Sequence, residues 1–215
     1  MRYLFLLILI AGVILYGKNK NLTINSSFSN TISITDNSSS INNRLQQKAK
    51  EALDFCTKNK YNTDFCILID MSIHSGKNRF FVYDFNSQKV IKDMLVSHGC
   101  GHNPWYADFT KENPKFSNED GSHLSSLGKY KIGKRGYSNW GINVNYQMFG
   151  LDATNSNAFK RQIVLHGWEA VSDQEIYPAG TPEGWGCPAI SNNSMRYVDE
   201  MLKKSDKSVL MWMFK

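Results

Sequence analysis

The chain has 215 residues, of which 41% are apolar, and a formal net charge of +6. This length suits one domain with an ordinary core. The charge is uneven, because residues 1–60 hold 8 basic and 3 acidic side chains while residues 61–215 hold 17 and 16. The larger part therefore lacks the concentrated basic surface of a nucleic-acid-binding protein. The basic N-terminal part fits an anionic membrane or wall polymer, or solubility alone.

Residues 1–17 are predicted to be a signal peptide or a signal-anchor. Arg2 precedes an apolar run over residues 3–16. The run is short for the roughly 20 residues that span a bilayer, and one basic residue before such a run is typical of a secretory signal. No A-x-A site follows, so cleavage and retention both stay open. Either outcome predicts an exported protein, periplasmic or at the cell envelope, that contacts a membrane through this segment only.

Residues 18–40 are dominated by Asn, Ser and Thr, a composition that buries too little apolar surface to fold, so we expect a polar disordered linker. From residue 41 apolar side chains recur at helical spacing, and Ser40 is placed to cap the helix that they form. The helix predicts the start of a single domain over residues 41–215.

The rest of the domain is rich in short apolar runs separated by Gly and Asn, which favours a mostly β or α+β fold. Strands are predicted over 65–71, 79–85, 90–97, 130–133, 142–149, 163–166 and 209–214. A second helix is predicted over 193–204. The stretch 99–126 is too long and polar for a simple turn, and loops of this length in compact domains are often functional.

Cys187 and His166 are the candidate nucleophile and base. Cys187 lies in the run E-G-W-G-C-P-A-I, and His166 ends a strand-like run 21 residues earlier. A thiol needs a neighbouring base to reach its reactive thiolate form. Gly186 allows a tight turn, so that its amide and that of Cys187 could hold an oxyanion. The alternative is a buried thiol and a core histidine, but a turn of G-W-G before Cys187 suits an exposed nucleophile better.

Several segments resemble the murein L,D-transpeptidase catalytic domain family, within the YkuD-like L,D-transpeptidase superfamily. They are D-F-N near 84, L-V-S-H-G at 95–99, F-S-N at 116–118, G-S-H-L-S-S-L-G at 121–128, R-Q-I-V-L-H-G at 161–167 and W-G-C-P-A at 185–189. The resemblance implies a mixed β-sandwich with peripheral helices, and an exported acyltransferase with Cys187 as nucleophile and His166 as base. It implies a peptidoglycan tetrapeptide stem as acyl donor and an amine as acceptor, or water in a carboxypeptidase. No cofactor or metal is expected.

Further site residues are expected around this pair. Gly167 joins the Gly186 and Cys187 amides as backbone support, and substrate contacts are expected from Trp185, Trp168, Ser125 and Ser126. Trp105 and Trp140 could also stack on sugars or peptide stems, although burial is the commoner fate of Trp.

The sequence departs from the family in front of the nucleophile. The family usually reads R-S-x-G-C-P-A, whereas this chain has Glu183 and Gly184 in place of Arg and Ser. The lost hydroxyl leaves open a second class of function, a non-catalytic wall-binding or structural module with the same fold. Papain-like wall peptidases fit less well, because they place Cys before His.

The remaining cysteines and histidines give weaker patterns. Cys56 and Cys66 are spaced to close a short loop while Cys100 stays free, although spacing alone does not establish a disulfide. His98, His102 and His123 lack the second Cys or His pair and the acidic partner of most zinc sites.

Overall fold

The computed structural model describes residues 29–215, which belong to two compact units that divide after Ser39. The predicted signal segment and the first part of the predicted linker lie outside the described residues. In this described part, no helix is long and apolar enough to cross a membrane.

Helix α1 (Ser29–Asn59) begins earlier than the sequence indicated. Residues 29–40 of the predicted linker are helical, and Ser40 lies inside the helix instead of capping it. Ser, Thr and Asn are only modestly poorer helix formers than Ala, and extending an existing helix costs far less than nucleating one. Composition alone therefore placed the helix start too late.

Eight strands form one mixed sheet, and this mostly β architecture with two α-helices confirms the predicted fold class. All seven predicted strands are present, but β7 was missed because two residues are too few to show a pattern. The strands are β1 (Phe65–Asp70), β2 (Phe80–Asp84), β3 (Lys89–Met94), β4 (Gly128–Tyr137), β5 (Val144–Gly150), β6 (Val164–Gly167), β7 (Ala189–Ile190) and β8 (Leu210–Phe214). Their order in the sheet is β3-β2-β1-β8-β4-β5-β6-β7.

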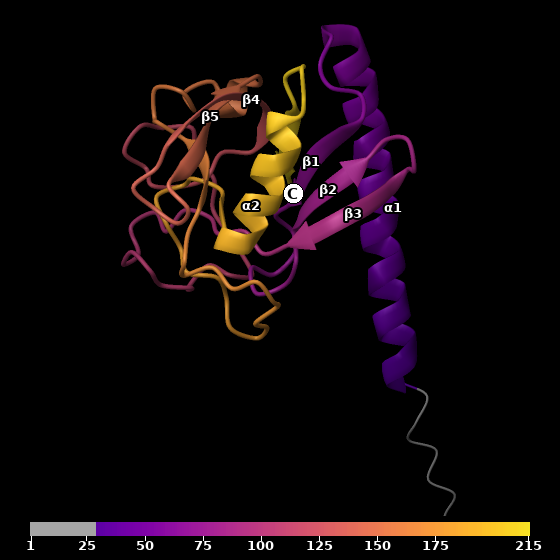
Figure 1. The fold of residues 1–215 in the computed structure, drawn as a ribbon. Helices are drawn as coiled ribbons and strands as arrows, with labels where there is room; N and C mark the ends of the chain where they lie inside the picture. Colours follow the sequence, from indigo (N-terminus) through magenta and orange to yellow (C-terminus); the bar gives the residue numbers. More distant parts are fainter. Residues whose placement is uncertain (1–28) are drawn as a thin grey trace, which may run out of the picture. The chain divides into compact units, whose positions relative to one another are not determined.

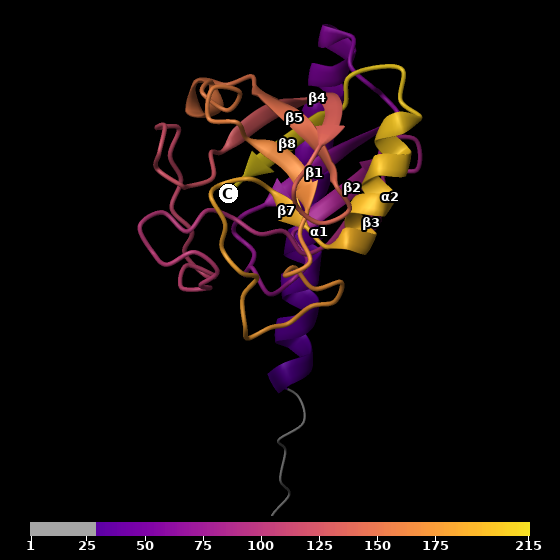
Figure 2. The same ribbon diagram turned by 60° about the vertical axis from the view of Figure 1, so that its left-hand side comes forward.

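The last strand in the sequence lies inside the sheet. Strand β8 pairs in parallel with β1 and antiparallel with β4, so it joins β1–β3 to β4–β7 (Figure 2). Its side chains are buried apart from the half-buried Trp212. The apolar run at 209–214 predicted this strand, but not its central place.

Alternate residues of β1 enter two different cores, as the side-chain period of a strand requires. Ile67 and Ile69 contribute to the larger core, which α2 (Asn192–Lys203) helps to form. Cys66 and Leu68 pack into a second core with the part of α1 that follows Ser40. Helix α2 and the part of α1 that follows Ser40 lie on opposite sides of β1–β3 (Figure 1).

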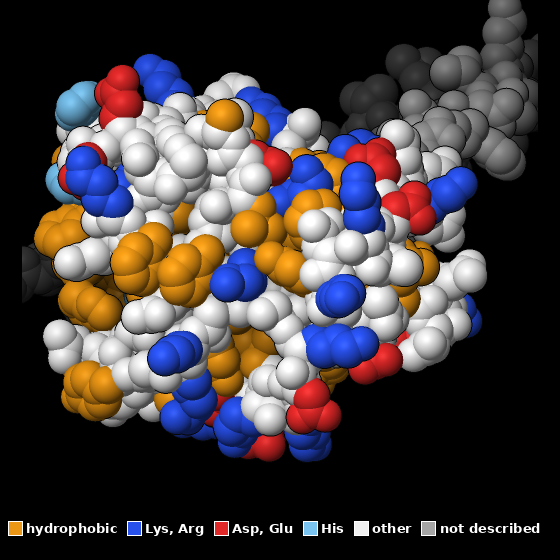
Figure 3. All heavy atoms as spheres, turned by 90° about the horizontal axis from the view of Figure 1, so that it is seen from above, with side chains coloured by type: hydrophobic (Ala, Val, Ile, Leu, Met, Phe, Trp, Pro, Cys, Tyr) orange, Lys and Arg blue, Asp and Glu red, His pale blue; other side chains and the backbone are white. Residues whose placement is uncertain are grey.

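All four cysteines are free, so Cys56 and Cys66 do not form the bridge considered from their spacing. Both are fully buried, and burial raises the pKa of the Cys56 thiol to about 12. On the face drawn in Figure 3, basic and acidic side chains lie intermixed. This mixture agrees with the nearly balanced charge of residues 61–215.

Candidate active site

Cys187 and His166 line one pocket of about 300 Å³. The walls are mostly aromatic and apolar, and the lining residues are Ser97, Trp105, Trp140, His166, Trp168, Gly184, Trp185, Cys187 and Ala189. The structure therefore brings together the predicted nucleophile, the predicted base and all four candidate tryptophans. Pockets of this size and lining are typical of small-ligand sites.

The sheet register places His166 beside Ala189. Strands β6 and β7 are parallel, and these two residues are partners in the register. Their neighbours Leu165 and Ile190 enter the larger core, so His166 and Ala189 lie on the other face, where the pocket is. On the far side of β7, the amide of Ser97 donates to the Ala189 carbonyl at 2.9 Å, which extends this row to a third chain segment.

A backbone carbonyl orients His166. Its Nδ1–H donates to the Gly167 carbonyl oxygen at 2.8 Å, so Nε2 is the nitrogen available to accept a proton. Burial lowers the pKa of His166, and the Gly167 hydrogen bond and the charge of Glu169 only partly oppose this effect. The imidazole is therefore neutral at neutral pH, as a general base must be. The Gly167 backbone thus contacts the predicted base through its carbonyl.

The Cys187 thiol is held against the backbone of β6. Its sulfur accepts a hydrogen bond from the Val164 amide at 3.5 Å. Burial raises the pKa of Cys187, while the Val164 bond and the charge of Arg161 pull it down. The thiol is consequently protonated at neutral pH. The resting pair is neutral, not a thiolate beside an imidazolium.

The turn before Cys187 requires glycine at one position and not at the other. Gly186 has φ +95°, and a Cβ there would lie 2.5 Å from the carbonyl oxygen of Leu124. A Cβ at Gly184 would meet only Trp168, at 3.8 Å. Within the described residues, the amides of Gly186 and Cys187 donate no hydrogen bond to protein acceptors. They are free to bind an oxygen that carries negative charge.

Ser125 and Ser126 are not among the residues that line the pocket. Ser125 accepts from the Gly99 amide and donates to the Gly186 carbonyl, both at 3.2 Å, so it ties the turn to the loop beside it. Ser126 donates to the Ser117 carbonyl oxygen at 2.7 Å. In this structure the two hydroxyls bond to protein atoms behind the nucleophile.

Arg161 is a site residue that the sequence reasoning missed. Its guanidinium donates to Ser126 Oγ at 2.6 Å and to the Leu124 carbonyl at 2.5 Å, and its charge lowers the pKa of Cys187. The available signal was that the run R-Q-I-V-L-H-G begins with a charged residue. The sequence analysis used this run as a family motif and gave Arg161 no role of its own.

Glu183, which stands where the family usually has Arg, is fully buried beneath the pocket. Its Oε1 accepts from the amide of Thr110 at 2.6 Å and from the Thr110 hydroxyl at 3.0 Å. The buried charge of Arg79 lies close enough for Glu183 to raise the pKa of that guanidinium against the effect of burial. These contacts compensate Oε1 of the buried carboxylate, whereas Oε2 has no hydrogen-bond partner among the described residues.

The same network fixes the tautomer of His98. Arg79 donates to His98 Nδ1 at 2.9 Å, so the proton of the neutral imidazole sits on Nε2, which donates to Thr110 Oγ1 at 2.5 Å. Burial, with a smaller contribution from Arg79, lowers the pKa of His98 to about 3. Backbone bonds from Gly184 to the His98 carbonyl and from Cys100 to the Gly184 carbonyl, both 2.8 Å, attach this network to the pocket wall.

Aromatic rings form most of the pocket rim. Trp168 is buried and stacks on Trp105 with centroids 5.6 Å apart. Trp185 is 63% exposed and stacks on His123 at 5.3 Å. Trp140 packs against Trp105 at 5.9 Å. An exposed aromatic group of this size on a folded domain is a common mark of a binding surface.

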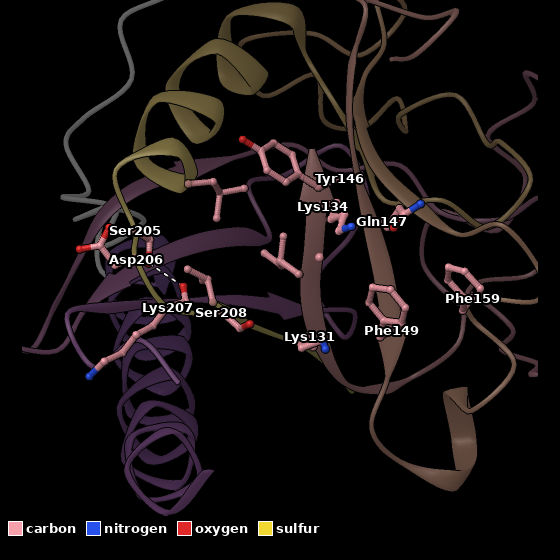
Figure 4. Close-up of a pocket in the computed structure, with 14 residues that line it drawn as sticks. Lys131, Lys134, Tyr146, Gln147, Phe149, Phe159, Ser205, Asp206, Lys207 and Ser208 are labelled. Atoms are coloured by element: carbon pink, nitrogen blue, oxygen red, sulfur yellow. Dashed lines mark hydrogen bonds between the residues drawn. The ribbon is translucent and has the colours of Figure 1, made fainter. Parts of the chain in front are cut away.

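A larger hollow, of about 650 Å³, lies between β4, β5 and the segment after α2 (Figure 4). Phe149 and Phe159 stack in it with centroids 4.9 Å apart, and Lys131 lies over the Phe149 ring. Neither Cys187 nor His166 lines this hollow. Of these two pockets of the described residues, only the smaller one is therefore lined by the predicted nucleophile and base.

A family model described as the L,D-transpeptidase catalytic domain matches residues 37–212. No curated protein sequence matches the chain. Among solved structures, the helical cell shape determining protein Pgp2 from Campylobacter jejuni is 13% identical, with a TM-score of 0.44 over 72% of this chain and 49% of that one. The Ldtfm-avibactam carbamoyl enzyme is 13% identical, with a TM-score of 0.40 over 71% and 49%. The chain thus spans about half the length of these proteins, and likenesses of this size do not indicate a shared activity.

Proposed function

Because the chain belongs to the L,D-transpeptidase catalytic domain family, we propose that it is a cysteine acyltransferase acting on peptidoglycan stem peptides. One observation carries the proposal: Cys187 and His166 line the same pocket, with the imidazole held neutral and its Nε2 available. A thiol with a neighbouring neutral imidazole is the arrangement that nucleophilic catalysis by cysteine requires. No cofactor enters the proposed chemistry.

In the proposed first step, His166 Nε2 takes the Cys187 proton as sulfur attacks the carbonyl carbon of the third stem residue. The amides of Gly186 and Cys187 donate to the oxygen that becomes negative. His166 then gives its proton to the departing nitrogen, the C–N bond breaks, and the terminal D-Ala leaves. The product is a thioester between the stem and Cys187.

In the proposed second step, an acceptor amine attacks the thioester carbon and loses its proton to His166. The new C–N bond forms, the C–S bond breaks, and the thiol is regenerated with the proton that His166 returns. Water in place of the amine would make the same cycle a carboxypeptidase. The substrate is a wall polymer, which fits an exported protein that is periplasmic or held at the cell envelope.

The test is incubation of the domain with a tetrapeptide stem, followed by mass spectrometry of the protein and of the released amino acid. Wild-type protein should gain the mass of the stem without D-Ala, and Cys187→Ala should gain none. His166→Ala should slow this acylation by at least about a hundredfold while it keeps its melting temperature. Equal product formation by Cys187→Ala would rule out the acyl-enzyme.

One feature favours a second candidate, a non-catalytic wall-binding module with the same fold. Gly184 lacks the hydroxyl that the family usually carries there, and it lines the pocket. In that case the wild-type protein would bind wall fragments without forming a thioester, whereas Gly184→Ser would form one. The mass measurement above separates the two candidates.

A further inference from the structure

Ser97 is a fully buried hydroxyl that lines the catalytic pocket. Among the described residues, its Oγ has no hydrogen-bond partner. A buried hydroxyl without a partner carries a desolvation cost, so such groups are rare and call for an explanation. Its place in the pocket wall supplies one, because a bound molecule could complete its hydrogen bonding.

The register indicates which part of a bound molecule would lie near Ser97. Ser97 and His166 flank Ala189 on its two sides, and all three line the pocket. The Ser97 amide bonds directly to the Ala189 carbonyl, and His166 is the partner of Ala189 in the register of β6 and β7. A small polar group bound beside Ala189 therefore lies next to the two chain segments that carry the imidazole and the hydroxyl.

The chemistry identifies this group as the reacting amine. In acyl transfer, His166 exchanges a proton with the nitrogen that leaves and then with the nitrogen that enters. A neutral entering amine has a further N–H, and a serine hydroxyl can accept a hydrogen bond from it. Resting on the proposed function, we propose that Ser97 is a substrate-binding residue whose Oγ accepts this bond and turns the nitrogen lone pair toward the thioester carbon.

The neighbouring residues keep the Ser97 hydroxyl in place. Ser97 is followed by His98, whose side chain is locked by Arg79 and Thr110, and its own amide is bonded to Ala189. A residue whose backbone is already fixed loses little conformational entropy when it binds a ligand. More of the free energy of its hydrogen bond therefore contributes to binding. This backbone anchoring is the reason that Ser97→Ala is expected to leave the pocket walls unchanged.

The experiment compares Ser97→Ala with Ser75→Ala in the full chain. Ser75 is also fully buried with an unpaired Oγ, but it does not line the pocket, which makes it a matched control. Each variant is assayed with a tetrapeptide stem and increasing concentrations of an amine acceptor such as D-alanine. Ser97→Ala should raise the acceptor KM or lower the transfer rate at least about tenfold, and both variants should keep or raise the melting temperature.

Unchanged acceptor kinetics in Ser97→Ala, with Cys187 still essential, would overturn the role of Ser97 and leave the proposed function standing. A loss of transfer with an equal loss of melting temperature would also overturn it, because Ser97 would then be structural. A wild-type protein that forms no acyl-enzyme would refute the proposed function, and the role of Ser97 with it.

Discussion

The guanidinium of Arg79 donates to Nδ1 of His98 at 2.9 Å, and both side chains are fully buried. This contact decides the protonation of the imidazole, because a nitrogen that accepts a bond from a cation is poorly placed to hold a proton of its own. The His98 proton is left on Nε2, where it reaches Thr110 and, through Thr110, the carboxylate of Glu183. The positive charge of Arg79 and the negative charge of Glu183 are thus connected through two neutral side chains, the His98 imidazole and the Thr110 hydroxyl.

The first prediction concerns that buried carboxylate. Glu183→Gln removes the buried negative charge that favours the charged form of Arg79, and should lower the free energy of unfolding by about 1–3 kcal/mol. Glu119→Gln, at an exposed position, should change it by less than about 0.5 kcal/mol. Chemical denaturation of the two variants measures both. Equal stabilities would show that Arg79 does not need its partner.

The second prediction concerns acid stability. The pKa of His98 is lowered to about 3, below the value of about 6.5 in an unfolded chain, so the unfolded state binds its proton first as pH falls. The contribution of His98 is therefore neutral above pH 6.5 and turns destabilising from there down to about pH 3. His74 and His166 have pKa values that burial lowers in the same direction.

His98→Gln should flatten this dependence. Between pH 5.5 and 4, it should reduce the slope of unfolding free energy against pH by about 1.4 kcal/mol per pH unit, which corresponds to one proton. Denaturant titrations at several pH values give the slope. An identical slope in wild type and His98→Gln would contradict a neutral, buried His98.

The third prediction concerns the reactivity of the nucleophile. Burial raises the pKa of Cys187, so the thiol is ionised at pH 7 to a smaller extent than an exposed cysteine, which is itself mostly protonated there. Alkylation by iodoacetamide should accelerate about tenfold for each pH unit through the neutral range, with no plateau below pH 9. Cys187→Ser should show almost no labelling in the native state, because the other three cysteines are buried. A fast, pH-independent reaction at pH 7 would indicate a stored thiolate instead.

The fourth prediction contrasts two glycines of one turn. Gly186→Ala forces a side chain into a left-handed conformation and against the Leu124 carbonyl, so it should cost at least about 1 kcal/mol of stability and lower acylation. Gly184→Ser makes only an ordinary van der Waals contact with Trp168 and should stay within about 0.5 kcal/mol of wild type. Its acylation rate should be unchanged or higher. A strongly destabilised Gly184→Ser would mean that the turn differs from the one described.

The sequence was most informative where a pattern is local. Apolar runs predicted the strands, and the local patterns around Cys187 and His166 singled out two residues that line one pocket, because alternation and turn glycines are encoded by neighbours. Ser97 and Arg161 escaped notice since their meaning depends on segments far along the chain. The pairing of residue 97 with residue 189 cannot be read from either segment alone.

Buried charges were also not predicted from the sequence. Glu183 was interpreted only as the replacement of the family's Arg, because a sequence gives no sign that an acidic side chain will be buried with hydrogen-bond partners. Arg79 likewise read as the first residue of a strand, whereas it is one of the largest fully buried side chains of the described residues. Such charges become interpretable only once their partners are known.

The central place of β8 also determines when the sheet can close during synthesis. Residues 210–214 are synthesised after β1–β7, so β1–β3 and β4–β7 leave the ribosome before the strand that joins them. Until then, the edges of β1 and β4 keep unpaired backbone groups that invite contact with other chains. The sheet therefore depends on β8 to close, and a chain cut short before residue 210 would be a substrate for chaperones and proteases instead of a folded domain.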